Sequence, residues 1–414
     1  ISGNVIANVA GIYELDVPPG AHTITPILEN LTYFTVSPSS YSATFPAQPS
    51  PMQQDFCVVA NGVHPDLEIT LLPLTSARPG FPSDYRLVCQ NKGTVVQSGT
   101  ITFEYPEATT DLTSSAPVAS LVSPGLLSWN YTDFLPFETR IYNISLIINT
   151  PMDTPPVNDG DQLDFDATIN PISGDETPGN NVSPLKQFVV NSFDPNDKTC
   201  LEGNTVAPEM IGEYVHYMIR FENTGTYAAQ NIVVKDMVDT SKFDVSTLIP
   251  ISGSHPFETR ISATNKVEFI FENIMLPFDD ATNDGYVAFK IKTLPTLIVG
   301  DTFSNNANIY FDYNFPIITN TAATTIEELG INDFEFAEFF TLYPNPTTNT
   351  LNIKCSNSVA ISSISFYNTL GQLLLLVSDS SGISTIDVSD LKAGNYFVKI
   401  DSDKGSSTGR FVKN

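Results

Sequence analysis

The chain has 414 residues, 46 acidic and 19 basic, so its formal net charge is −27. This excess of acid argues against nucleic acid or an anionic membrane surface as a partner, because both would repel it. With 41% hydrophobic and 11% aromatic residues, the composition is that of a folding chain and not of a disordered acidic tail. No apolar run approaches the roughly 18 residues that span a bilayer, so we expect no transmembrane segment. The chain starts at Ile1 without Met or a signal-like stretch, and we expect a fragment or processed form of a longer protein.

Turn residues and alternation predict strands along nearly the whole chain. Thirty prolines and 23 glycines leave little room for helices. Segments such as 217–222 and 267–272 alternate apolar and charged residues, which is typical of an antiparallel sheet with one wet face. The predicted fold class is all-β: tandem immunoglobulin-like and prealbumin-like β-sandwich modules that end in a small β-sandwich.

Three modules are predicted before the acidic linker. Residues 1–62 resemble the prealbumin-like repeats of bacterial surface proteins. No Lys or Arg precedes Arg78, so the Lys–Asn isopeptide bond that some of those repeats carry is excluded within this segment. Residues 63–193 and 194–326 resemble the immunoglobulin-like conserved repeats of large secreted bacterial proteins, and each contains a strand followed by Asn-x-Gly-Thr, at 91–94 and 223–226.

The electrical character changes after a linker at 327–340, which holds five acidic and no basic residues. Residues 341–414 carry six basic and five acidic side chains, a net +1, so the first 340 residues account for −28. The acidity therefore belongs to the body and the linker, and the C-terminal segment is a separate unit.

Several ordered motifs mark the C-terminal segment 341–414. It opens with Tyr-Pro-Asn-Pro, continues through an Asn-x-x-Gly turn and a Leu-x-x-Gly-x-Tyr element, and closes with a lysine near its end. These motifs closely resemble the type A C-terminal sorting domain of the type IX secretion system of Gram-negative bacteria. The residues that the resemblance assigns to recognition are Tyr343, Pro344, Asn345, Pro346, Gly371, Leu391, Gly394, Tyr396 and Lys413.

The resemblance implies a protein that is addressed and processed by others. Such a domain folds into a small β-sandwich that an outer-membrane shuttle β-barrel captures as the cargo leaves the translocon. A sortase-like surface peptidase then removes it, here by a cut in or near the linker 327–340. The implied location is secreted or on the cell surface, reached through the periplasm and outer membrane. Recognition is expected at the terminal strand and at 343–346. The apolar run 373–377 is either an exposed patch or, the favoured reading, a strand buried on both faces.

Metal and redox chemistry receive little support. The four cysteines, at 57, 89, 200 and 355, are too widely spaced for a Cys-x-x-Cys motif, and buried thiols are favoured over disulfides. Calcium could bind oxygen atoms of Asp194, Asn196, Asp197, Asp280 and Asp284. The loop that contains Asp280 and Asp284 lacks a closing acid, because Ile291 stands where a bidentate Glu is needed. Solvated turns are therefore favoured over calcium.

The sequence contains no motif typical of a catalytic site, and we expect no enzyme activity. The leading hypothesis is an exported cargo whose modules form a stalk. The first alternative is an adhesin that binds carbohydrate or protein, with the lone Trp129 as its candidate aromatic platform. The second is an accessory part of a larger secreted enzyme with its catalytic domain before Ile1.

Overall fold

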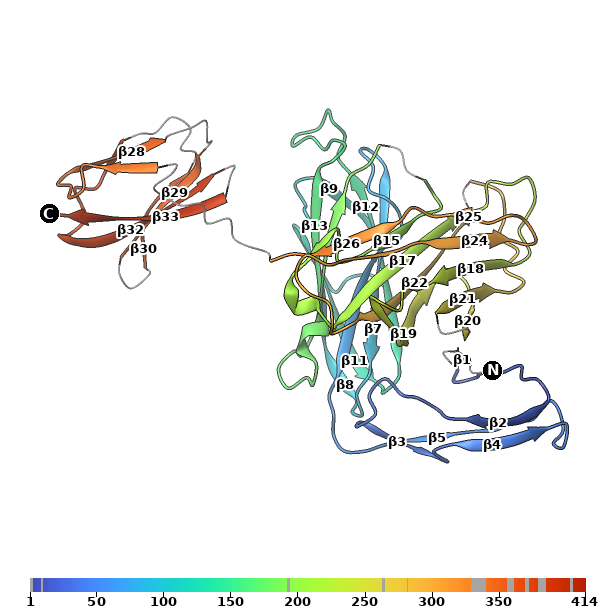
Figure 1. The fold of residues 1–414 in the computed structure, drawn as a ribbon. Coiled ribbons are helices and arrows are strands. Elements are labelled where there is room, and N and C mark those ends of the chain that lie inside the picture. Colours follow the sequence, from blue (N-terminus) through green and yellow to red (C-terminus); the bar gives the residue numbers. More distant parts are fainter. Residues whose placement is uncertain are drawn as a thin grey trace. The chain divides into compact units, whose positions relative to one another are not determined.

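A computed structural model describes residues 3–8, 10–191, 194–262, 265–280, 282–328, 340–355, 361–368, 372–378, 385–402 and 405–414. In these ranges the regular structure consists of strands and two 3-10 turns, which confirms the all-β prediction. None of the described helical segments is long and apolar enough to cross a membrane. The chain divides into two compact units, Ile1–Glu327 and Glu328–Asn414 (Figure 1).

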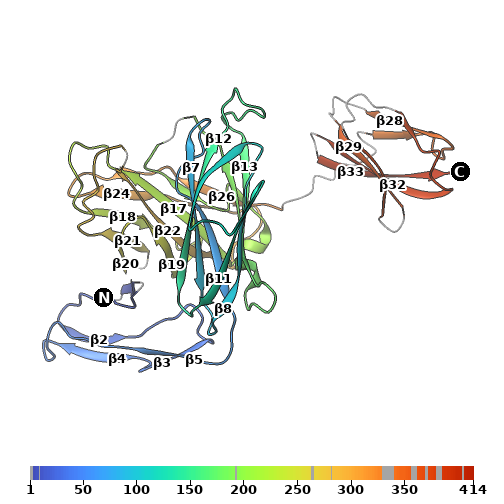
Figure 2. The same cartoon turned by 180° about the vertical axis from the view of Figure 1, so that it is seen from behind.

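The first 62 residues contribute narrow ribbons and one strand of a neighbouring sheet. The strands are β1 (Gly3–Ile6), β2 (Gly20–Ile24), β3 (Phe34–Ser37), β4 (Tyr41–Phe45) and β5 (Cys57–Ala60). Antiparallel pairs form between β2 and β4 and between β3 and β5, and the ribbons lie in one elongated layer along the edge of the unit (Figures 1 and 2). Strand β1 instead pairs with β20 (Glu258–Ser262). Only Tyr33, Phe34 and Ala43 are buried among the described residues of this segment, so it depends on contacts outside itself.

The first sandwich spans the segment predicted at 63–193. One sheet has the order β6 (Leu67–Pro73), β7 (Pro82–Asn91), β12 (Thr139–Ile148), β9 (Thr110–Ala116). The other has the order β10 (Leu121–Ser123), β11 (Leu126–Phe134), β8 (Gln97–Glu104), β13 (Gln162–Asn170), β14 (Val182–Phe188), and the turn η1 (Pro178–Asn181) precedes β14. Alternate residues of β13 enter the core between the sheets, as a period of two requires: Leu163, Phe165, Ala167 and Ile169.

The second sandwich uses three sheets around a core rich in phenylalanine. The first has the order β15 (Lys198–Cys200), β17 (Tyr214–Glu222), β22 (Asp284–Thr293), β19 (Phe243–Gly253). The second has the order β1, β20, β21 (Lys266–Phe271), β18 (Ile232–Met237), β24 (Ala307–Phe311), β25 (Ile317–Ile318). The third has the order β16 (Thr205–Val206), β26 (Ala322–Ile326), β23 (Thr302–Asn305), and the turn η2 (Pro208–Met210) follows β16.

The two sandwiches pack against each other through β6 and β7 on one side and β17 and β22 on the other. In both views the strands of the first sandwich run steeply across those of the second (Figures 1 and 2). An apolar cluster separate from either core fills the contact: Leu72, Val88, Leu201, Met218, Tyr286 and Ala288. This explains why all seven residues of β6 are buried, since one face packs in its own sandwich and the other on its neighbour.

A buried ion cluster lies at the same contact. The Nζ atom of Lys290 is 2.7 Å from both carboxylate oxygens of Glu68 and 3.0 Å from Glu29 Oε1. Lys92 Nζ approaches Glu29 at 2.6 Å and Glu68 at 2.7 Å. Burial by itself would raise the pKa of Glu68, but the two ammonium groups outweigh it and hold that pKa at about 2. The cluster joins the first segment to both sandwiches as an ion network.

The C-terminal unit is a two-sheet sandwich. One sheet has the order β27 (Phe340–Tyr343), β28 (Thr350–Cys355), β31 (Thr385–Asp387). The other has the order β30 (Leu373–Ser378), β29 (Ile361–Asn368), β32 (Gly394–Ser402), β33 (Gly405–Lys413), so the last strand of the chain is an edge strand. Buried residues of both sheets form one core, among them Phe340, Leu351, Phe366 and Phe411.

Candidate functional site

The Tyr-Pro-Asn-Pro turn follows directly from β27. Tyr343 is the last residue of that strand, pairs with Asn352, and leaves 47% of its surface exposed. The peptide bonds before Pro344 and Pro346 are both cis. Because proline has no backbone N–H to donate, strand pairing ends here and the turn stands on the surface. Residues 343–346 are all exposed.

Asn345 ties this turn to the end of the chain. Its Nδ2 atom donates to the carbonyl oxygen of Arg410 at 3.1 Å, and its Oδ1 atom accepts from the backbone N–H of Val412 at 2.9 Å. The amide thus occupies the place that a neighbouring strand would take beside the edge strand β33. Donor and acceptor in one short side chain are needed here, which asparagine supplies.

Thr347 adds backbone hydrogen bonds between this turn and the end of the chain. Thr347 accepts from the backbone N–H of Asn414 at 2.9 Å and donates to the carbonyl of Val412 at 2.8 Å, which makes a parallel bridge to Lys413. We call residues 343–347 and 410–414 together the terminal clasp. The clasp brings together the two regions, 67 positions apart, that the sequence assigned to recognition.

The remaining predicted residues support the clasp from within. Tyr396 is 8% exposed, donates its hydroxyl to the carbonyl of Lys392 at 2.7 Å and stacks on Phe411 with a centroid distance of 5.6 Å. Leu391 packs against the same core, and Gly394 begins β32. Gly371 lies outside the described residues.

Lys413 is 8% exposed, and its Nζ atom donates to the carbonyl of the neighbouring Asn414 at 2.8 Å. Its side chain is therefore folded against the domain and held at the clasp.

The apolar run 373–377 forms β30, the other edge strand of its sheet. Leu375 and Val377 pack against the core, whereas Leu374 is 43% exposed. The favoured prediction of burial on both faces is therefore wrong at Leu374. The reason is that β30 lies on a two-sheet sandwich whose outer face is open to solvent. The side chains of Leu373 and Leu376 lie outside the described residues.

Three of the predicted calcium ligands, Asp194, Asn196 and Asp197, already take part in hydrogen bonds or an ion pair. Arg220 binds both carboxylate oxygens of Asp197 at 2.7 Å, and Asn196 Oδ1 accepts from the backbone N–H of Glu222 at 3.2 Å. Asp194 Oδ1 accepts from the N–H of Asn196 at 2.9 Å.

Asp280 and Asp284 lie before and at the start of β22. Burial, and then the charges of Glu222 and Asp280, raise the pKa of Asp284. Among the described residues, no three acidic, His or Cys side chains are arranged to hold a metal ion.

The thiols and imidazoles are in structural environments. Cys200 is buried and donates to Glu202, which also contacts His216 Nδ1 at 2.6 Å. One oxygen atom of the Glu202 carboxylate contacts the thiol and the other contacts the imidazole. Burial, and then Glu202, raise the pKa of the Cys200 thiol. Cys89 is buried as predicted, whereas the prediction is wrong at Cys57, because β5 belongs to a narrow ribbon whose four residues are all exposed. The side chain of Cys355 lies outside the described residues.

Trp129 is 2% exposed and donates its Nε1–H to the carbonyl of Pro117 at 2.8 Å, so its prediction as a binding platform is wrong. A flat alternating strand cannot show from sequence alone which of its faces is covered.

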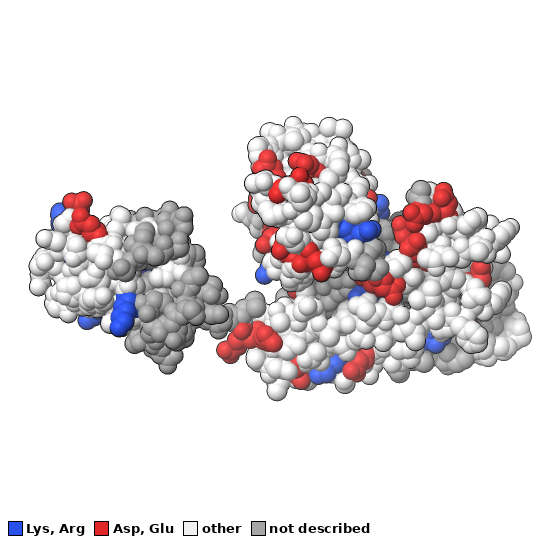
Figure 3. Space-filling model, turned by 90° about the horizontal axis from the view of Figure 1, so that it is seen from above, with Lys and Arg blue, Asp and Glu red and all other residues white. Residues whose placement is uncertain are grey.

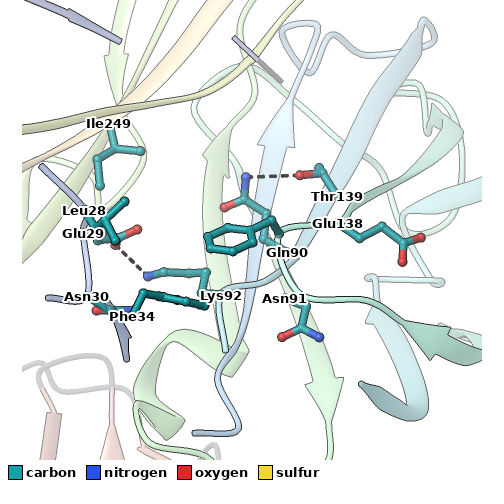
Figure 4. Close-up of a pocket in the computed structure, with 11 residues that line it drawn as sticks. Leu28, Glu29, Asn30, Phe34, Gln90, Asn91, Lys92, Glu138, Thr139 and Ile249 are labelled. Carbon is teal, nitrogen blue, oxygen red and sulfur yellow. Dashed lines mark hydrogen bonds and ion pairs between the residues drawn. The ribbon is translucent and has the colours of Figure 1, made fainter. Parts of the chain in front are cut away.

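A small cavity of about 200 Å³ lies where the first segment meets the sandwiches (Figure 4). The Lys92–Glu29 ion pair and the rings of Phe34 and Phe137, whose centroids are 4.6 Å apart, form part of its wall. The charged groups of that pair already bind each other, and neither His nor Cys lines the cavity.

Comparisons with known proteins identify two parts of the chain. Residues 341–414 match the family described as secretion system C-terminal sorting domain, and residues 194–325 match a domain of unknown function, DUF7619. No curated protein matches the chain.

The solved structures that resemble the chain are remote. They include the C-terminal domain of the AgI/II polypeptide BspA of Streptococcus agalactiae (13% identity, 63% of this chain, 99% of that chain, TM-score 0.23). The C-terminal domain of the antigen I/II-family protein AspA of Streptococcus pyogenes is similar at 13% identity over 64% of this chain and 99% of that chain, with a TM-score of 0.23. The MSCRAMM ACE of Enterococcus faecalis is similar at 10% identity over 64% of this chain and 95% of that chain, with a TM-score of 0.24. At these TM-scores the likenesses carry no argument. The C-terminal match does: residues 341–414 are a type IX secretion system sorting domain, and the chain is a cargo exported across the outer membrane to the cell surface or the medium.

Proposed function

We propose that the terminal clasp is the surface by which the export machinery reads the folded sorting domain. The observation that carries the proposal is the pair of hydrogen bonds from Asn345 to the backbone of β33. Recognition at two regions 67 positions apart requires the folded domain, so an unfolded chain would not present the signal. The proposed readers are the outer-membrane shuttle β-barrel and the translocon. The sortase-like peptidase would then cut in the linker 327–340, of which residues 329–339 lie outside the described residues.

Export of the full chain in a bacterium that has this secretion system tests the proposal. Asn345→Ala removes both hydrogen bonds, and deletion of residues 411–414 removes the partner strand end. Each change should leave the protein in the periplasm, measured by immunoblot of periplasm, cell surface and medium. Asn349→Ala is the matched control, because this exposed asparagine of the same loop contacts Val388 through its backbone carbonyl. Trp129 fluorescence of the retained protein checks that the body has folded. Export of both variants at the control level would refute the clasp as the signal.

We propose that the body, residues 1–327, is a non-catalytic stalk. Supporting this are the raised pKa of the Cys200 thiol, the engagement of His216 by Glu202, and the docking of the two sandwiches through an apolar cluster and buried ions. A docked pair holds its length better than two sandwiches on a flexible tether. Acidic side chains lie in several groups over the face in Figure 3, which suits a protein that stays dispersed in water. Hydrolase and transferase screens of the purified chain should show no turnover; a turnover rate that scales with protein concentration would contradict the proposal.

An adhesin is the second candidate, and one observation favours it. Three loops meet at one end of the second sandwich, where Asp312 accepts from the N–H groups of Gln230 and Asn231 at 3.2 and 2.8 Å, and Ala229 bonds to Leu276 at 2.9 Å. These loops expose aromatic side chains that could stack on sugar rings: Tyr227, Phe278, Tyr313 and Phe315.

Binding of the purified chain to a glycan array tests this candidate. The triple change Tyr227→Ser, Tyr313→Ser and Phe315→Ser should abolish any signal, whereas Phe188→Ser, an exposed aromatic of the first sandwich, should not. Binding that survives the triple change would place the ligand elsewhere.

A further inference from the structure

Three polar side chains meet inside the second sandwich, where the surrounding core is apolar. Lys198 lies on β15, Asp236 on β18 and Asn305 on β23, so each comes from a different sheet. Lys198 and Asp236 are fully buried and Asn305 is 5% exposed. A charged pair at such depth is costly unless every polar atom is satisfied.

The carboxylate of Asp236 joins the other two groups. Its Oδ2 atom contacts Lys198 Nζ and also accepts from Asn305 Nδ2 at 3.1 Å. The amine and the carboxamide therefore lie beside one another at a single oxygen atom. No donor in the described part of the chain reaches Asp236 Oδ1, although that atom is buried.

Aromatic rings exclude water from the amine. The Nζ atom of Lys198 lies 4.8 Å from the ring centroid of Tyr217 and 5.1 Å from that of Phe289. Burial lowers the pKa of Lys198 although Asp236 opposes it, and burial raises the pKa of Asp236 although Lys198 opposes it. Both shifts favour a neutral amine beside a protonated carboxyl group, and a neutral amine is a nucleophile.

The ion cluster at the contact between the sandwiches provides an internal comparison. There Glu68 is also buried, but lysines bind both of its oxygens and its pKa is held at about 2. Asp236 has one lysine, one unsatisfied oxygen and a pKa shifted the other way. The surroundings of Glu68 stabilise an ion pair, whereas those of Asp236 allow it to transfer protons between an amine and an amide.

We propose that Lys198 and Asn305 form an intramolecular isopeptide bond, with Asp236 as the catalytic acid and base. The lone pair of Lys198 Nζ attacks Cγ of Asn305 to give a tetrahedral intermediate. Asp236 takes one proton from the attacking nitrogen and delivers one to Nδ2. The bond between Cγ and Nδ2 breaks, ammonia leaves, and Asp236 returns to its starting protonation state. One amine and one carboxamide become one secondary amide and one ammonia, so no oxidant, metal or cofactor is needed.

The bond would join β15 to β23, near the two ends of the segment 194–326. A pulling force applied between the two ends of the module would then pass through the cross-link, and most of the segment between residues 198 and 305 would be shielded from it. Such a cross-link suits a module that lies in the chain between the first sandwich and the sorting domain. The proposal concerns covalent structure and does not depend on recognition of the terminal clasp.

Intact-mass spectrometry of the purified full chain tests the proposal directly. The denatured protein should weigh less than its sequence mass by one ammonia, and a protease digest should contain a branched peptide that joins Lys198 to Asn305. Asp236→Asn and Asn305→Ala should each restore the full sequence mass, while Lys235→Arg, on the neighbouring position of β18, should keep the loss.

The unsubstituted protein decides the question even if a variant fails to fold. A folded native chain with its full sequence mass and no branched peptide would overturn the proposal. So would an ammonia loss that maps to any other pair of residues.

Discussion

The buried ion cluster predicts that the two sandwiches unfold as a coupled pair. Lys290→Met removes a side chain that is 3% exposed and keeps its apolar stem, but leaves Glu68 with Lys92 as its only ammonium partner. Lys290 makes three carboxylate contacts between 2.7 and 3.0 Å. Breaking a buried ion pair on one side generally costs about 3–5 kcal/mol. Because Lys92 still neutralises part of the charge, we expect a loss of about 3 kcal/mol in the free energy of unfolding.

The lone tryptophan makes the assay specific. Trp129 is buried in the core of the first sandwich, whereas Lys290 lies on β22 of the second. Urea unfolding followed by Trp129 fluorescence therefore reports the first sandwich after a change made in the second. A lower midpoint with an unchanged slope would show that the ion cluster couples them.

Arg260→Met is the matched control, because it breaks the Arg260–Glu258 pair, whose side chains are 40% and 43% exposed. An exposed pair is generally worth about 0–1 kcal/mol. The double variant Glu68→Gln with Lys290→Met removes both charges and should recover part of the lost stability. If Lys290→Met shifts the midpoint no further than Arg260→Met, the reasoning is refuted.

Three other outcomes are expected. The pKa of Glu68 is lowered from 4.5 to about 2, so its ionisation contributes stability above pH 4.5 that is lost as the pH falls toward 2. Urea midpoints measured across this pH range should therefore fall more steeply in the native chain than in Glu68→Gln. Parallel curves for the two proteins would contradict the lowered pKa. Gly285→Ala would place a Cβ 2.1 Å from the ring of buried Phe221 and should lower the free energy of unfolding by about 1–3 kcal/mol. Gly179→Ala, whose Cβ would have no atom within 4 Å, should leave stability nearly unchanged. Equal melting temperatures of the two variants would contradict the close packing at Gly285. Asn345→Ala should speed amide exchange at Val412 while exchange at Phe397, bonded within the sheet, stays slow; uniform exchange at both positions would mean that the clasp does not hold the strand end.

Local patterns predicted much of the fold. The alternation in β17 and β21 and the frequent Gly and Pro turns identified an all-β chain, because side-chain direction in a strand repeats every two residues. The Tyr-Pro-Asn-Pro motif likewise located the start of the sorting domain, since its residues are adjacent. The motif did not predict that Asn345 would bind the backbone of Val412 in the last strand.

Sequence reasoning failed where partners are distant. Glu68 stands in an otherwise uncharged strand, and Lys290 follows a run of uncharged residues in another, which was a signal for buried charge that alternation alone did not explain. The sequence could not pair them, because they are 222 positions apart. Strand β1 was assigned to a segment of its own, yet it pairs with β20 of the second sandwich.

The sequence by itself determined the class of fold, the boundary of the sorting domain and the export of this protein, because all three depend on residues near one another in the chain. Only the tertiary structure decided which charges meet in the interior and which strand ends form the clasp. The entropy cost of closing a loop grows only with the logarithm of its length, so spacing hardly restricts which strands become neighbours. The sequence could exclude an isopeptide bond in its first segment from the lack of lysine, but only the fold placed Lys198, Asp236 and Asn305 at one carboxylate oxygen.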